Sequence, residues 1–214
     1  VEAYHRGIYG NTARITDPEE IDAIVQAHRY LADCAAKDNR GSDWHWRNTI
    51  NITYHLKNGG TLSRQYQLRD EDLTAVRAML ETETFRRSVV LDSVDVNADA
   101  LRHGYINNSD KELERDLSAQ ECRLLYQTLL EDIAHMNMLD PALYDYQNSR
   151  LDITLEDDEK TISARLNPQC TRTLALLQEW GLIGSPGEAF GATDDGDAED
   201  TIAYSSSIGI ITID

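Results

Sequence analysis

Hydrophobic and polar residues alternate with a period of two on both sides of Asn58-Gly59-Gly60. Strand side chains point alternately to opposite faces of a sheet, so this period is typical of a strand buried on one face. The Asn-Gly-Gly centre favours a tight turn between two such strands. Residues 50–68 therefore predict a β-hairpin. The large side chains of this hairpin share the even positions: Ile50, Ile52, Tyr54, Leu56, Leu62, Tyr66 and Leu68.

The register of this hairpin depends on the length of its loop. A two-residue loop would place Leu56 opposite Thr61 and send the two apolar sets to opposite faces. A three-residue loop, with a glycine in the left-handed conformation, brings both sets to one face. Because the buried face sets the register, we expect the three-residue loop. The resulting pairs are Leu56 with Leu62, Tyr54 with Arg64, Ile52 with Tyr66 and Ile50 with Leu68.

A second alternating stretch, residues 151–166, predicts another hairpin. An even-length loop around Asp158-Glu159 brings the apolar sets of its two strands together. Asn167-Pro168 then starts a helix, and Gly181 ends it. A hairpin that leads directly into a helix thus occurs twice, at residues 46–82 and 150–182.

Three further helices begin at capping signals. Asp17 caps the first, with Pro18 at its first helical position. Asp70 caps the second, and Ser118 forms a capping box with Glu121 at the start of the third. The apolar residues at helical spacing, expected in the core, are Ile21, Ile24, Val25, Leu31, Leu73, Val76, Met79, Leu80, Cys122, Leu125, Tyr126, Leu129, Ile133 and Met136.

Leu124 and Leu130 widen the apolar arc of the third of these helices. A wide arc predicts burial on more than one side.

The remaining segments have weaker patterns. Residues 1–14 predict one strand and a connection, and residues 88–96 predict a strand with its valines at even positions. Residues 97–116 are polar and are expected to be mostly loop. Residues 202–213 return to β character after a Gly- and Asp-rich segment.

These elements together predict an α+β fold. Its sheet is expected to be largely antiparallel, built from recurring β-hairpin–helix units, with the helices packed on the sheet. The expected organisation is an α+β domain over residues 1–184, an acidic linker over 185–201 and a C-terminal strand over 202–214. Two similar halves, 1–84 and 85–184, are an alternative organisation of the domain.

The charge balance narrows the range of partners. The 214 residues include 20 Lys plus Arg and 38 Asp plus Glu, for a formal net charge of −18. Nucleic acid and anionic membrane surfaces are poor partners for so acidic a chain. No apolar run approaches 18 residues, so we expect no membrane-spanning segment within this sequence. A chain that begins at Val1 is expected to be a piece of a longer protein.

No sequence motif indicates catalysis or a metal site. GxSxG, P-loop, HExxH and dinucleotide-binding patterns are missing from the sequence. The cysteines Cys34, Cys122 and Cys170 each lie in a predicted helix and suggest neither a disulfide framework nor zinc. The acidic run 194–200 lacks the ligand spacing of a calcium loop, which favours a solvated linker. We therefore expect no catalytic residue, no metal and no cofactor.

Five residues in and before the first hairpin are candidates for binding. Four are aromatic and one is a cation among apolar residues. A buried arginine needs partners, so Arg64 is expected either to pair with a carboxylate and Tyr54 or to lie at a rim open to solvent. The first alternative makes the face a scaffold, and the second offers aromatic walls and a fixed cation to an anionic or peptide ligand. The candidates are Trp44, Trp46, Tyr54, Arg64 and Tyr66.

Three sequence stretches resemble a known family. The first is Thr16-Asp17-Pro18-Glu19-Glu20-Ile21, with His28 one turn beyond Ile24. The second is the hairpin sequence from Ile52 to Tyr66, and the third runs from Cys170-Thr171-Arg172 to Trp180-Gly181. Together they resemble the extracytoplasmic domain, of unknown function, of certain ABC-type transporter permeases from Gram-positive bacteria. The resemblance covers most of residues 1–183 and carries over no catalytic residues.

The resemblance implies a non-enzymatic domain on the extracytoplasmic side of the cell membrane. Its partners would be the membrane region of the parent permease and a separate ATPase subunit, and it would bind a ligand, a peptide or a partner protein. Two alternatives do not depend on the resemblance. One is a stand-alone protein-interaction module that uses an exposed strand edge. The other is an enzyme acting on a small cationic substrate, motivated by the acidity and the aromatic cluster.

Overall fold

The structure of the protein is a computed structural model that describes residues 2–5, 11–15, 17–37, 49–55, 59–67, 69–92, 96–108, 112–144 and 151–190. The chain divides into two compact units. Within the described ranges, the first unit comprises residues 2–92 and 137–144, and the second comprises residues 96–136 and 151–190.

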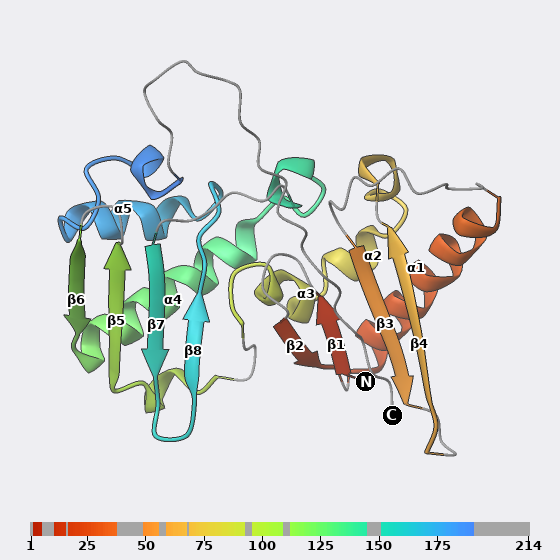
Figure 1. The fold of residues 1–214 in the computed structure, drawn as a ribbon, viewed down its shortest axis with the longest axis horizontal. Helices are drawn as coiled ribbons and strands as arrows, with labels where there is room; N and C mark the ends of the chain where they lie inside the picture. Colours follow the sequence, from red (N-terminus) through yellow and green to blue (C-terminus); the bar gives the residue numbers. More distant parts are fainter. Residues whose placement is uncertain are drawn as a thin grey trace. The chain divides into compact units, whose positions relative to one another are not determined.

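The first unit has a four-stranded antiparallel sheet in the order β2-β1-β3-β4 (Figure 1). The strands are β1 (Glu2–His5), β2 (Asn11–Arg14), β3 (Thr49–His55) and β4 (Thr61–Gln67). The helices are α1 (Pro18–Lys37), η1 (Asp70–Asp72), α2 (Arg77–Leu80), α3 (Glu83–Ser88) and η4 (Pro141–Tyr144).

The second unit has a four-stranded antiparallel sheet in the order β6-β5-β7-β8. The strands are β5 (His103–Asn108), β6 (Leu113–Leu117), β7 (Leu151–Glu156) and β8 (Thr161–Ala164). The helices are η2 (Ala98–Ala100), α4 (Ala119–His135), α5 (Thr171–Glu179) and η5 (Pro186–Phe190). Figure 1 shows α4 crossing one face of this sheet.

The two units share one topology. In each unit a hairpin leads through a long helix, α1 or α4, into a second hairpin, and further helices follow. In each sheet the first strands of the two hairpins are neighbours, which gives the orders β2-β1-β3-β4 and β6-β5-β7-β8. The α+β class, the antiparallel pairing and the packed helices agree with the sequence prediction.

The predicted hairpin at residues 50–68 is confirmed as β3–β4, but its predicted register is wrong. The observed pairs are Ile50 with Tyr66, Ile52 with Arg64 and Tyr54 with Leu62, two residues away from those expected. A shift of two keeps even positions opposite even positions, so the alternating pattern satisfies both registers equally. The turn decides between them, and Gly59 has a φ of +79°, the left-handed conformation expected of a glycine here.

The hairpin β7–β8 confirms the second prediction. Leu155 pairs with Ile162 and Ile153 with Ala164, across the expected even-length loop. The following helix starts later than predicted, at Thr171. The Asn167 side chain accepts a hydrogen bond from the Gln169 amide at 2.8 Å, which holds residues 167–169 in a turn before the helix.

Two strand and loop predictions between the hairpins are wrong. Of the strand predicted at residues 88–96, Ser88 ends α3 and residues 89–92 form a turn rather than a strand, while 93–95 lie outside the described ranges. Residues 97–116, expected to be loop, contain β5 and most of β6. Where one strand was predicted, residues 2–5 and 11–14 form two paired strands.

The helix starts at Asp17 and Ser118 are confirmed by their caps. The Asp17 carboxylate accepts from the amides of Glu19 and Glu20 at 2.9 and 3.0 Å. The start predicted at Asp70 is wrong, because Arg69 is the capping position of η1. Leu124 is 45% exposed, so α4 is not buried on that side as predicted. Buried as expected are Ile24, Leu31, Leu73, Val76, Met79, Leu80, Cys122, Leu125, Tyr126, Leu129, Ile133 and Met136, whereas Ile21 and Val25 are only half-buried.

Gly104 is a residue of β5 at which the strand packs closely against its neighbours in the second unit. A Cβ built on Gly104 would lie 2.7 Å from the Thr154 carbonyl oxygen and 3.0 Å from the Cys122 sulfur. The Thr154 carbonyl oxygen is a backbone atom, so it could move away only if the backbone of β7 moved. A side chain at Gly104 would therefore push β5 away from β7 or α4.

We expect Gly104→Ala to lower the free energy of unfolding by roughly 1–3 kcal/mol, the usual cost of overpacking. Gly187→Ala is the matched control, since its Cβ would meet no atom closer than 4.0 Å. Urea denaturation of both variants measures the difference. Equal stability of the two would contradict the close approach at Gly104.

Candidate functional site

Two of the five sequence-predicted binding residues lie outside the described ranges, and for the other three the structure describes the strand but not the side chain. Trp44 and Trp46 lie in the range 38–48, whose placement is not described. Tyr54 lies on β3, and Arg64 and Tyr66 lie on β4. The predicted pairing of Tyr54 with Arg64 is wrong, because Tyr54 pairs with Leu62. Whether Arg64 is paired or at a rim stays a prediction.

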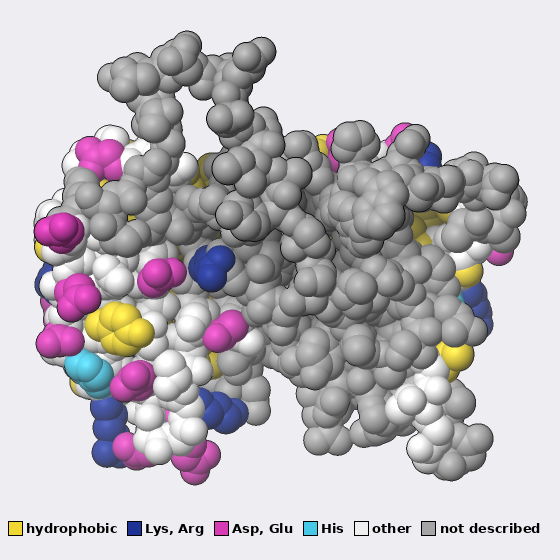
Figure 2. All heavy atoms as spheres, viewed as in Figure 1, with side chains coloured by type: hydrophobic (Ala, Val, Ile, Leu, Met, Phe, Trp, Pro, Cys, Tyr) yellow, Lys and Arg dark blue, Asp and Glu magenta, His cyan; other side chains and the backbone are white. Residues whose placement is uncertain are grey.

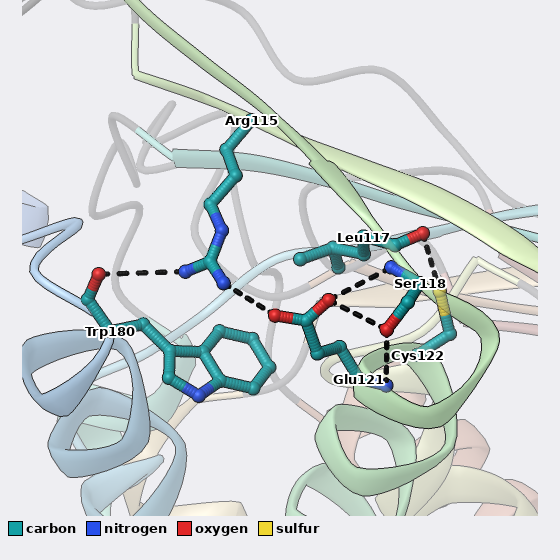
Figure 3. A network of polar contacts seen from close by, with 6 residues as sticks. All are labelled: Arg115, Leu117, Ser118, Glu121, Cys122 and Trp180. Carbon is teal, nitrogen blue, oxygen red and sulfur yellow. Dashed lines mark hydrogen bonds and ion pairs between the residues drawn. The ribbon is translucent and has the colours of Figure 1, made fainter.

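A polar network joins β6, α4 and α5 in the second unit (Figure 3). The Arg115 guanidinium donates to the Glu121 carboxylate and, at 3.4 Å, to the Trp180 carbonyl oxygen. It also lies over the Trp180 ring, 5.0 Å from the ring centroid, in a cation–π contact. The side chains of Arg115 and Glu121 are 31% and 29% exposed.

The Glu121 carboxylate in this network forms hydrogen bonds at the start of α4. Glu121 accepts from the Ser118 amide at 2.9 Å and from the Ser118 hydroxyl at 2.7 Å, which completes the predicted capping box. These two hydrogen bonds, followed by the charge of Arg115, lower the pKa of Glu121 below its ordinary 4.5. The network therefore ties β6 to the start of α4 and to the end of α5.

The buried carboxylate of Asp132 joins α4 to α5. It is 3% exposed and accepts from the Thr173 amide at 2.8 Å, the Thr173 hydroxyl at 2.7 Å and the Arg172 amide at 3.1 Å. Free amides at a helix start are favourable partners for a negative charge. Asp132 therefore caps α5 from a neighbouring helix.

A second buried carboxylate, Asp72, has a similar role in the first unit. It is 1% exposed and accepts from the Arg69 amide at 2.9 Å and from the Tyr30 hydroxyl, on α1, at 3.1 Å. A hydrogen bond with Cys34, burial and the Asp72 carboxylate together raise the pKa of Tyr30 to about 12. Both buried acids thus hold a helical segment against another helix.

The buried thiols have the properties of packing residues. Burial raises the pKa of Cys170 to about 12 and is also the main cause that raises the pKa of Cys122. Thiolate is the nucleophilic form of cysteine, so neither thiol is activated. Within the ranges that the structure describes, no group of three or more His, Cys, Asp or Glu side chains is arranged to hold a metal ion.

The open face of the second sheet is a surface feature that sequence analysis missed (Figure 2). Strands β5, β6 and β7 turn their buried residues toward the helices and their exposed residues to the other side. Tyr105, at the middle of β5, is 40% exposed on this open face. The sequence signal that was missed is the alternating pattern around Ile106 on β5. The charged residues of the following strand, β6, made the whole segment resemble a loop.

The chain matches no known family model, no curated protein and no solved structure. Among the described residues, no helix has both the length and the apolar character needed to cross a membrane.

Asp132→Ala should lower the free energy of unfolding by roughly 1–3 kcal/mol, because it leaves buried donors at the start of α5 without an acceptor. Glu131→Ala is the matched control. Its carboxylate makes an exposed ion pair with Arg172 at 3.0 Å, and such pairs contribute about 1 kcal/mol or less. Chemical denaturation, with amide hydrogen exchange in α5, distinguishes the two. Equal effects would show that the buried cap is dispensable.

The contribution of Glu121 to the free energy of unfolding should depend on pH. Its folded-state pKa is lowered, so its contribution is complete above the ordinary pKa of 4.5 and is lost as pH falls through the folded-state value. The difference in free energy of unfolding between the natural chain and Glu121→Gln should therefore shrink as the pH is lowered below 4.5. Denaturation at several pH values measures it, with Glu114→Gln, at an exposed site on β6, as the control. A difference that does not change with pH would contradict this assignment.

Proposed function

We propose that this chain is a non-catalytic extracytoplasmic domain of an ABC-type transporter permease from a Gram-positive bacterium. In this role it binds a ligand, a peptide or a partner protein. Its partners are the membrane region of the parent permease and a separate ATPase subunit, so ATP hydrolysis takes place outside the domain.

The agreement between the family-like sequence stretches and local structure carries this proposal. The first stretch coincides with the capped start of α1 at Pro18. The second coincides with the antiparallel hairpin β3–β4. The third runs from the capping residue Cys170 through α5 to Gly181, whose φ of +73° ends the helix. Each stretch of the resemblance thus coincides with a cap or a turn in the fold of this chain.

The buried polar groups support a role without catalysis. A general acid or base needs a group whose protons are free to move to a substrate. Asp72 and Asp132 instead accept hydrogen bonds from backbone amides and neighbouring side chains. Burial makes Cys122 and Cys170 poor nucleophiles. These groups are explained by the packing of helices.

A stand-alone protein-interaction module is the second candidate. The open face of the β6-β5-β7-β8 sheet favours it, because Tyr105 is an exposed aromatic residue on a face that no described helix covers. Large exposed aromatic residues are common in protein interfaces. The two candidates differ in whether the domain belongs to a membrane protein.

Labelling of intact bacterial cells tests the transporter proposal. The full-length natural chain that contains this sequence should carry several apolar stretches of about 20 residues. In that chain, Asp22→Cys introduces an exposed thiol on α1, in a background where Cys34→Ser removes the half-buried one. A membrane-impermeant maleimide should label Asp22→Cys in intact cells.

The control for this experiment is a cytoplasmic protein with an exposed cysteine, which should react only after lysis. Labelling of Asp22→Cys only after lysis would contradict the extracytoplasmic location. A full-length chain without long apolar stretches would overturn the transporter proposal and leave the interaction module.

A further inference from the structure

We draw no further inference here: the strongest candidate, the buried side-chain oxygen of Asn108 at the end of β5, which has no hydrogen-bond partner among the described residues, carries nothing because no second observation in the structure points to a ligand there.

Discussion

The second unit depends on a carboxylate buried between two helices. Asp132 belongs to α4, yet its oxygens accept the first free amides of α5. The helix start supplies partial positive charge and unpaired donors, which offset the cost of burying the anion. This arrangement fixes where α5 begins relative to α4. The position of α5 in turn sets where Trp180 meets Arg115 of β6.

The first unit uses the same kind of interaction with the roles exchanged. There the acid, Asp72, belongs to the helical segment that follows the second hairpin, and the donor from the earlier helix is Tyr30. In the second unit the acid is on the earlier helix and the donors are on the later one. Two units of the same topology thus join equivalent pairs of helical elements with a buried acid. The carboxylates that would first suggest catalysis are parts of this packing.

Sequence patterns predicted the elements whose signals are local. The hairpin β3–β4, the caps at Asp17 and Ser118 and the even loop of β7–β8 follow from alternation, capping and turn residues. The register of β3–β4 could not be predicted, because a two-residue shift keeps the same faces together. Helix α3 was not predicted, because it is only six residues long and the valines that follow it suggested a strand beginning at residue 88.

The candidate site shows the same limit. The aromatic residues near the first hairpin are conspicuous in the sequence, but the face around Tyr105 becomes apparent only when β5, β6 and β7 are assembled. Surfaces built by cross-strand neighbours have no contiguous sequence signal.

The charges that concealed β6 from sequence analysis have a consequence for the folded chain. β6 ends the second sheet, so one side of its backbone has no neighbouring strand in the described fold. An unpaired edge is a template on which a strand of another molecule can add, and this is a common beginning of aggregation. Glu114, Arg115 and Asp116 put three consecutive charged side chains on that edge. The charged residues that make β6 resemble a loop in the sequence therefore also protect the edge of the sheet from pairing with strands of other molecules.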